Sequence, residues 1–170
     1  MKKWFFLLAS GLALFMGACK KDKTAGCTAV QTTIVATSAE IDSLNSYFTH
    51  NGITNAIQHE CGAFYTIDSV GTGKNPGICT SIAVTYSGNF FGNPVPFQSY
   101  TDSAGIVFAL VDVIVGWQRV LPELKVGGRI TIYIPPSLGY GSVDKKNADG
   151  DIIIPKNSYL KFNINLLQVY

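Results

Sequence analysis

The chain has 170 residues, of which 47% are hydrophobic and 14% charged, and this composition supports a sizeable buried core within one domain. Its formal net charge is only +2, and part of that comes from Lys2 and Lys3 at the start. Because no basic stripe runs along the sequence, we do not expect a nucleic acid as a partner.

Residues 1–18 predict the signal peptide of a bacterial lipoprotein. Lys2 and Lys3 precede an uncharged apolar run, Trp4 to Phe15, which is shorter than the ~20 apolar residues that span a bilayer. Such a run is typical of a secretory signal. Met16-Gly17-Ala18-Cys19 resembles a lipobox, so Cys19 is the expected lipidation site and membrane anchor. This predicts a place in the bacterial cell envelope, periplasmic or surface-facing; the alternative is an ordinary signal peptide with an incidental cysteine.

Three cysteines follow Cys19, namely Cys27, Cys61 and Cys79. An envelope location permits a disulfide, but an odd number leaves one thiol free or paired between chains. The spacings contain no C-x-x-C, and the two histidines, His50 and His59, stand in no recognisable ligand cluster. We therefore expect no metal site, no redox motif and no cofactor.

Residues 19–60 are expected to form a polar tether followed by one short helix, Ser38 to Phe48. Ser38 suits the N-cap position, and Ile41, Leu44 and Phe48 share one face of the helix. Asn51-Gly52 is a stop signal for it. This segment is predicted to be a spacer, or a lid packed on the main domain.

From residue 61 onward the pattern changes to strands. The predicted strands are Ala63–Ile67, Ser81–Tyr86, Val107–Leu110, Arg129–Ile134 and Tyr159–Val169. One helix-forming stretch, Val113 to Lys125, is interrupted by Pro122, and Gly127-Gly128 turns the chain. Mostly antiparallel strands with one short late helix predict an α+β domain over residues 61–170, in which a curved sheet wraps one helix.

Several aromatic residues stand next to glycine or in turns. Tyr86 precedes Ser87-Gly88, Phe97 lies in a proline-rich loop, Trp117 follows Gly116, and Tyr140 stands between two glycines. Glycine lets the backbone pass close by, so such rings can line a concavity. The pattern predicts an apolar pocket for a small ligand such as a proline ring, although ordinary core packing is the alternative for Trp117.

Five blocks of residues carry a family resemblance, and they occur in order over residues 62–170. They are Val84–Gly88 (V-x-Y-[ST]-G), Phe108–Leu110 with Val113–Trp117 (F-x-L…V-I-x-G-W), Leu124–Gly128, Ile134–Gly141 (I-P-x-x-L-[AG]-Y-G), and Ile154-Pro155 with Leu160–Phe162. Together they resemble the FKBP-type peptidyl-prolyl cis/trans isomerases. The fold that this implies is a five-stranded antiparallel sheet wrapped around a short helix.

The resemblance also implies the site. Its catalytic residues would be Tyr86, Phe97, Gln98, Ile114, Trp117 and Tyr140, and its substrate-binding residues Phe108, Val113, Ile153, Ile154 and Phe162. Trp117 would be the floor of a proline pocket, the backbone N–H of Ile114 would hold a substrate carbonyl, and the Tyr140 hydroxyl another. The implied partners are proline-containing exported polypeptides and FK506-type macrolide inhibitors.

Three departures from the family pattern stand out. Gln98 takes the place of a usual aspartate, so the pocket lacks that carboxylate unless Asp102 reaches in. The loop 142–153 is long and polar; its Asp144, Asp149 and Asp151 lack calcium-loop spacing, so a solvated loop is expected. Lys156 stands where a second proline is common. The alternatives to an isomerase are therefore a catalytically weak binding module or chaperone, and a structural lipoprotein with a vestigial pocket.

Overall fold

A curved antiparallel sheet and one short helix organise the computed structural model, which describes residues 27–170. The predicted signal peptide and Cys19 lie outside the described residues. The helices and 3-10 turns are α1 (Ser38–His50), η1 (Leu110–Asp112), α2 (Val115–Val120), η2 (Leu121–Glu123) and η3 (Pro136–Leu138). The strands are β1 (Ile57–Gln58), β2 (Phe64–Ser69), β3 (Ser81–Phe90), β4 (Gln98–Tyr100), β5 (Ile106–Ala109), β6 (Arg129–Ile134), β7 (Lys145–Lys146), β8 (Ile152–Ile154) and β9 (Leu160–Val169).

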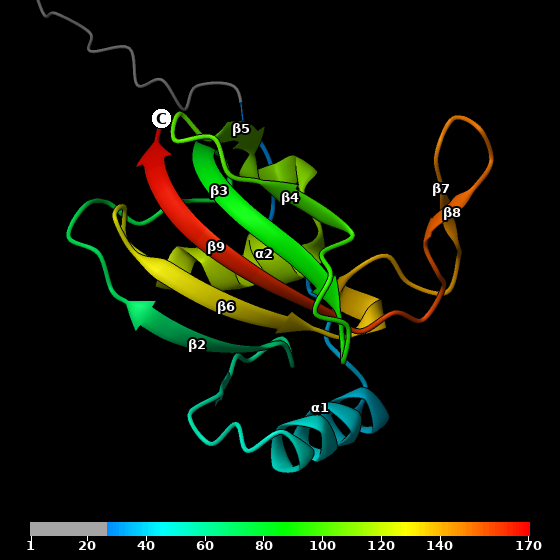
Figure 1. The fold of residues 1–170 in the computed structure, drawn as a ribbon. Coiled ribbons are helices and arrows are strands. Elements are labelled where there is room, and N and C mark those ends of the chain that lie inside the picture. The colour runs from blue at the N-terminus through cyan, green and yellow to red at the C-terminus, as the bar shows by residue number, and fades with distance from the viewer. Residues whose placement is uncertain (1–26) are drawn as a thin grey trace, which may run out of the picture.

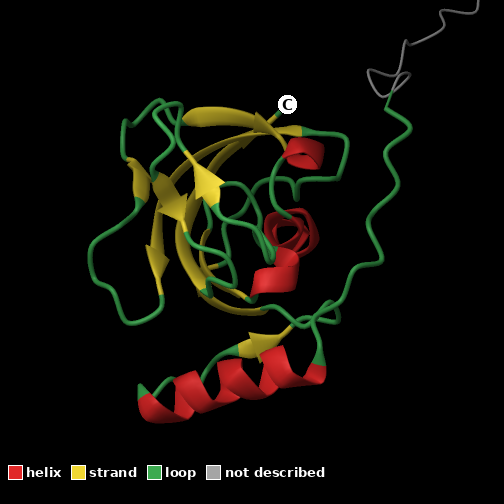
Figure 2. Cartoon of the chain, turned by 90° about the vertical axis from the view of Figure 1, so that its right-hand side faces the viewer, coloured by secondary structure: helices red, strands yellow, loops and turns green. Residues whose placement is uncertain are grey.

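The main sheet runs in the order β1-β2-β6-β9-β3-β4, and β5 also pairs with β3. Figure 1 shows this sheet curving around α2, and Figure 2 shows α2 on one side of the strands. The α+β fold with a curved antiparallel sheet around a short helix is thus confirmed. The sheet has seven strands rather than five. The difference arises because β4 and β5 both pair with β3 and the two-residue β1 extends the edge.

Strand β9 shows how the sequence pattern sets the core. Leu160, Phe162, Ile164 and Leu166 are buried and alternate with the half-buried Lys161, Asn163 and Asn165, the period of two that a strand imposes. The buried set packs with Ile130, Ile132 and Ile134 of β6 in the main core. On the outer face Thr131 donates to Asn163, and Asn163 donates to Ser87, so polar side chains are satisfied across strands.

The helical stretch is shorter than the predicted Val113–Lys125. Ile114 is extended, with φ −60° and ψ 151°, and α2 begins only at Val115. At its other end α2 passes into the 3-10 turn η2, which contains Pro122. A proline breaks the regular α-helical hydrogen bonds, so this end is explained by local chemistry. The buried residues Trp117, Val120 and Leu121 face the main core.

Helix α1 packs on the other face of the sheet. Its buried Leu44 and Phe48 contact Phe64 of β2 and Tyr133 of β6, whose chain neighbours point into the main core. Thr37 caps the helix in a capping box with Glu40, so the prediction of Ser38 as the cap is wrong by one residue. The helix ends before Asn51-Gly52, as predicted.

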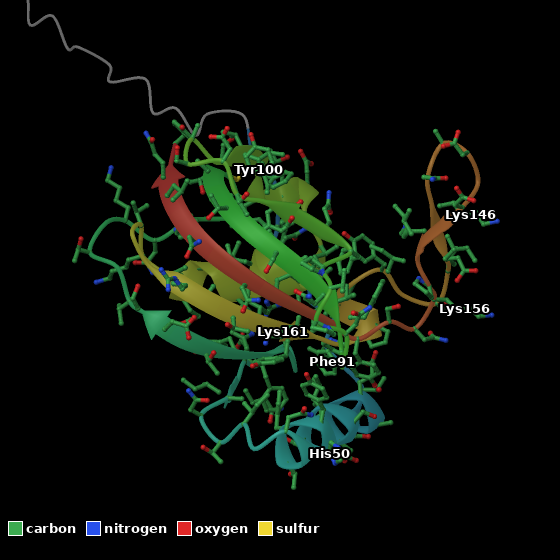
Figure 3. The ribbon with its side chains drawn as sticks, in the orientation of Figure 1. His50, Phe91, Tyr100, Lys146, Lys156 and Lys161 are labelled. Carbon is green, nitrogen blue, oxygen red and sulfur yellow. A yellow bond between two sulfur atoms is a disulfide. The ribbon has the colours of Figure 1, made fainter. Side chains whose placement is uncertain are left out.

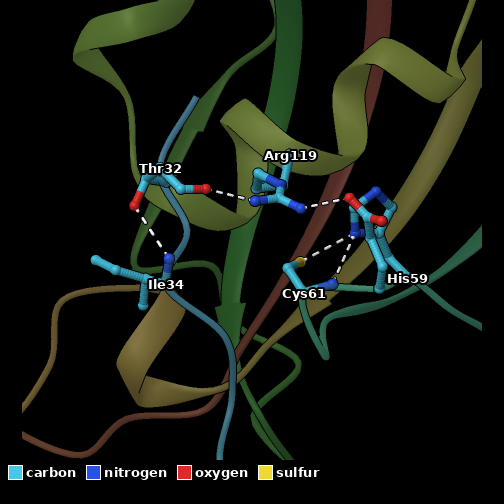
Figure 4. Close-up of polar contacts among 6 residues, drawn as sticks. Thr32, Ile34, His59, Cys61 and Arg119 are labelled. Atoms are coloured by element: carbon cyan, nitrogen blue, oxygen red, sulfur yellow. Dashed lines mark hydrogen bonds and ion pairs between the residues drawn. The ribbon is translucent and has the colours of Figure 1, made fainter. Parts of the chain in front are cut away.

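A disulfide joins Cys27 to Cys79, and Cys61 is a buried free thiol. Between Cys27 and α1 the chain crosses α2, where the Arg119 guanidinium donates to the Thr32 carbonyl (Figure 4). The same guanidinium pairs with Glu60. Within residues 27–170, the described part of the predicted tether is therefore fastened to the domain at several points.

The loop 142–153 forms a small hairpin, β7–β8, that projects away from the main sheet (Figure 1). Lys146 and Lys156 lie on this projection in Figure 3. Lys145 and Lys146 are exposed, and the Lys145 ammonium lies 5.9 Å from the centre of the Tyr140 ring. Among the described residues, no helix is long and apolar enough to cross a membrane.

Candidate functional site

A cavity of about 230 Å³ opens between the sheet and α2. Its lining residues come from β3, β4, β5, η1, α2, β9 and the segment after η3. They are Tyr86, Gln98, Phe108, Asp112, Val113, Ile114, Trp117, Tyr140 and Phe162. The volume suits one small ring or side chain rather than an extended ligand.

Trp117 forms the floor of this cavity. Its indole is 4% exposed and meets three other rings edge-on, with interplanar angles of 86–90°. The ring centres of Tyr86, Phe108 and Phe162 lie 5.3, 6.2 and 5.2 Å from that of Trp117. Edge-to-face packing is a favoured aromatic geometry. The indole therefore lines the cavity within a wall of rings.

Two glycines near the cavity leave room for side chains that pack against the backbone. A Cβ on Gly88 of β3 would lie 2.6 Å from Cε1 of Phe162 and 2.8 Å from Cζ of Phe97. A Cβ on Gly116 of α2 would lie 2.7 Å from Cδ1 of Ile134. Any side chain at either position would displace its neighbours. Gly88 thus makes room for two rings and Gly116 for an isoleucine, none of which is the aromatic residue beside that glycine in the sequence.

A few polar groups face or border the cavity. Burial raises the pKa of Tyr140, and burial together with nearby Tyr140 raises that of Tyr86, so both keep neutral hydroxyl groups at neutral pH. Within the described chain, the Ile114 N–H donates to no protein acceptor, and the buried Trp117 Nε1 likewise has no partner. Hydroxyl and backbone donors are therefore present beside an apolar floor.

Most of the residues predicted for the site come together there. Nine residues line the cavity, and eight of them were predicted: Tyr86, Gln98, Phe108, Val113, Ile114, Trp117, Tyr140 and Phe162. Phe97 does not line it but packs edge-on against Phe162, at 5.8 Å between ring centres. Ile153 is half exposed near the projecting hairpin, and Ile154 is buried in the core. Neither isoleucine lines the cavity; both belong to β8, which pairs with β7 in the hairpin.

Asp112 lines the cavity and was missed by the sequence prediction. It is the last residue of η1 and is exposed, five positions before Trp117 in the same block. Asp102, the predicted substitute for a carboxylate, instead accepts the N–H of Ala104 in its own turn and lies outside the cavity lining. The position of Asp112 inside the Phe108–Trp117 block was the available signal.

The residue types in the cavity lining indicate that it acts on a ligand through non-covalent contacts. Its ionisable side chains are Asp112 and the two tyrosines, and the lining contains no histidine, cysteine, serine or lysine. A nucleophile with an adjacent base is therefore not assembled in the cavity. In the part of the chain that the structure describes, no cluster of metal-ligating side chains occurs either. The cavity can enclose an apolar ring and donate hydrogen bonds to its flanks.

The fold and cavity define a small α+β domain with an aromatic pocket between a curved sheet and a short helix. Residues 73–167 match the family model described as FKBP-type peptidyl-prolyl cis-trans isomerase, which is more than half of the chain. The chain therefore belongs to the FKBP-type peptidyl-prolyl cis-trans isomerase family.

Curated relatives and solved structures agree with this membership. The chain is 39% identical over 109 residues to the FKBP-type peptidyl-prolyl cis-trans isomerase FkpA of Buchnera aphidicola, covering 64% of this chain and 41% of that protein. It is 34% identical over 108 residues to the peptidyl-prolyl cis-trans isomerase Mip of Coxiella burnetii, covering 64% and 45%. The chain thus spans less than half the length of these relatives. The crystal structure of FkpA from Escherichia coli superposes with a TM-score of 0.60 at 28% identity, covering 76% of this chain and 58% of that one.

A second solved structure supports the fold alone. The peptidyl-prolyl cis-trans isomerase of Pseudomonas syringae pv. tomato superposes with a TM-score of 0.63 at 24% identity. The match covers 81% of this chain and 98% of that one. This coverage exceeds the 64% reached by the sequence matches, so the structural likeness extends further along the chain.

Proposed function

We propose that this chain is a peptidyl-prolyl cis/trans isomerase that assists the folding of exported proteins. The proline ring of an X-Pro segment enters the cavity and rests on Trp117, with Tyr86, Phe108 and Phe162 around it. The observation that carries this proposal is the Trp117 indole at the floor of a small cavity. Three rings surround the indole, and each lies nearly perpendicular to it. A pyrrolidine ring matches such a space in size and polarity.

The proposed mechanism favours the twisted amide over the planar one. Rotation about an X-Pro bond is slow because amide resonance imposes a barrier of about 18–20 kcal/mol. A dry aromatic site disfavours the charge separation of the planar amide, and so the twisted state binds better. The Ile114 N–H and the Tyr140 hydroxyl donate to the carbonyls that flank the proline. No acid, base or covalent nucleophile takes part.

Gln98 favours a second candidate, a binding module or chaperone that holds proline-containing segments with weak catalysis. The side chain lines the cavity but carries no charge where the family usually has an aspartate. It still donates and accepts hydrogen bonds. Both candidate functions use the same pocket, and in either case an FK506-type macrolide is the inhibitor that this pocket would bind.

A protease-coupled isomerisation assay on an X-Pro peptide tests the proposal, with Gln98→Asp and Tyr140→Phe beside the wild type. We expect the wild type to be active and Tyr140→Phe to lose about two- to tenfold in kcat/KM, the value of one hydrogen bond. An inert wild type with an active Gln98→Asp variant would favour the binding module. If both are inert and neither peptide nor macrolide binds, the pocket has no such function.

We further propose that the protein is anchored in the bacterial envelope through a lipid on Cys19, after removal of residues 1–18. Residues 19–60 then connect the anchor to the isomerase domain, residues 61–170. The disulfide between Cys27 and Cys79 supports an oxidising compartment. In membrane fractionation of producing cells, Cys19→Ala should move the protein out of the membrane pellet. Retention of that variant in the pellet would contradict the anchor.

A further inference from the structure

Glu40, near the start of α1, joins this helix to the segment that carries Tyr140. One of its carboxylate oxygens accepts the backbone N–H of Ser137 at 2.9 Å, and the other accepts the Ser137 hydroxyl at 2.8 Å. The two residues are 97 positions apart in sequence. Ser137 lies in η3, three residues before Tyr140. Through this contact, α1 on the outside of the sheet is hydrogen-bonded to the segment that contributes Tyr140 to the cavity lining.

The same carboxylate completes the cap of α1. It accepts the Thr37 N–H at 2.9 Å and the Thr37 hydroxyl at 3.1 Å, so four donors converge on Glu40. Burial alone raises the pKa of Glu40, but the hydrogen bonds from Thr37 and Ser137 outweigh it and hold the pKa below its ordinary value. The group is therefore ionised at neutral pH, and its hydrogen bonds are charge-assisted.

The turn η3 depends on an acceptor from outside. It begins at Pro136, directly after Pro135, and neither proline has an N–H to donate. Three N–H groups after Ser137 donate to the carbonyls of these prolines: Leu138 to Pro135, and Gly139 and Gly141 to Pro136. Within the described chain the Ser137 N–H has Glu40 as its acceptor. Glu40 therefore fixes the start of the turn from which Tyr140 projects into the cavity.

We propose that Glu40 is a positioning residue of the isomerase: it holds η3 so that the Tyr140 hydroxyl faces the bound peptide. This inference rests on the proposed function, because Tyr140 meets a substrate only there. On this view α1 is part of the support of the pocket and not merely a spacer. Thr37 supplies a matched control, since Thr37→Ala weakens the same helix cap but leaves the contact between Glu40 and Ser137 in place.

Hydrogen–deuterium exchange of the full chain tests the positioning without any activity. We expect Glu40→Ala to speed exchange of the amides in residues 137–141 by about tenfold, because local opening no longer breaks the Ser137 contacts. Thr37→Ala should leave this segment as in the wild type. Glu40→Gln, which keeps the size and one acceptor oxygen, should be intermediate, and it replaces Glu40→Ala if that variant does not fold. Unchanged exchange in 137–141 would overturn the proposal.

Kinetics then test the link to catalysis. We expect Glu40→Ala to lower kcat/KM on an X-Pro peptide by about three- to tenfold through misplacement of Tyr140, and Thr37→Ala by less than about twofold. In a Tyr140→Phe background the further loss from Glu40→Ala should shrink below about twofold. A full additive loss in that background would overturn the proposal. An inert wild type would instead refute the proposed function, and the exchange experiment would still decide on the positioning of η3.

Discussion

Asp112 places a carboxylate in the lining of a pocket where Gln98 contributes an uncharged amide. The two side chains enter from different elements, Gln98 from β4 and Asp112 from η1. Asp112 is exposed, so its charge acts through solvent and is worth little for stability. Its effect is expected instead on which peptides enter.

We predict that Asp112 favours a lysine next to the proline. Asp112→Asn should lower the ratio of kcat/KM for a Lys-Pro peptide over a Leu-Pro peptide by about two- to fivefold, the range of an exposed ion pair. The effect should fade at about 1 M salt, where the screening length falls to about 3 Å. Lys145→Met, which removes a cation near Tyr140, is the matched control and should shift the ratio the other way. If Asp112→Asn left this ratio unchanged, the carboxylate would play no part in the choice between the two peptides.

His59 is a second residue whose charge state matters, beside the buried Cys61. Its Nδ1 accepts the Cys61 N–H at 3.1 Å and lies 3.1 Å from the Cys61 Sγ, so the bonded ring is neutral (Figure 4). Burial and then the Arg119 cation lower the pKa of His59, while Glu60 and Glu123 oppose them. Burial also raises the pKa of Cys61, which keeps it a thiol.

The lowered pKa of His59 predicts a loss of stability in mild acid. The unfolded chain binds a proton there at a higher pH than the folded chain does. The stabilisation that comes from neutral His59 is therefore complete above the ordinary histidine pKa. It is lost as the pH falls through the pKa of His59 in the folded chain. The slope cannot exceed about 1.4 kcal/mol per pH unit. Urea unfolding between pH 5 and 8, with His59→Asn as the variant that keeps an acceptor, should show the slope in the wild type and a smaller one in the variant.

At the scale of the elements, β3 contributes to the pocket through a glycine, whose lack of a side chain leaves room for neighbouring rings. Gly88 leaves room for Phe162, which lines the cavity, and for Phe97 behind it. Gly88→Ala should cost about 1–3 kcal/mol of unfolding free energy, because overpacking pushes both rings aside. Urea unfolding and peptide binding should both report the change.

Gly77 offers a matched control for that substitution. A Cβ there would lie 4.0 Å from the nearest atom, Cγ2 of Thr80, which is ordinary contact. Gly77→Ala should therefore stay within about 0.5 kcal/mol of the wild type. If Gly88→Ala were as stable as Gly77→Ala, the close packing of Phe162 on β3 would be wrong.

The elements also show how far local patterns carry a prediction. The strands β6 and β9 followed from alternation, which depends only on neighbours in sequence. The hairpin β7–β8 did not, because its strands are only two and three residues long and its pairing joins Lys145 to Ile154 across a loop. The choice of Thr37 over Ser38 as the helix cap depends on backbone angles that two adjacent hydroxyl residues do not distinguish.

The site followed from the family resemblance even where separate segments meet, and contacts with residues outside that resemblance did not follow. The resemblance predicted Trp117, Tyr140 and Phe162 together in the cavity lining. The contact of Ser137 with Glu40, 97 positions away, involves a residue that lies in none of the matching blocks. The pairing of Cys27 with Cys79 likewise depends on which thiols the fold brings together, and three cysteines allow three pairings. Ile154 belongs to a family block but is buried in the core rather than in the cavity lining.

At the scale of the whole molecule, the disulfide fastens the start of the described chain to the start of β3. Cys27 and Cys79 are 52 residues apart, and the segment between them includes α1 and β2. The contacts of Thr32 with Arg119 and of Ala36 with Cys61 hold the same segment. The bond closes a loop across a sequence separation of 52 residues, and this closure lowers the conformational entropy of the unfolded chain.

We predict that the double variant Cys27→Ser, Cys79→Ser loses about 2–4 kcal/mol of unfolding free energy, because the unfolded chain regains the freedom of the opened loop. Urea unfolding without reductant measures this loss. With dithiothreitol, the wild type should fall to the stability of the variant, while the variant itself should not change. Cys61 remains in both proteins and, being buried, serves as an internal control for thiol effects. A wild type that is insensitive to reductant would mean that the cross-link contributes nothing and that the contacts at Arg119 and Cys61 alone hold the segment.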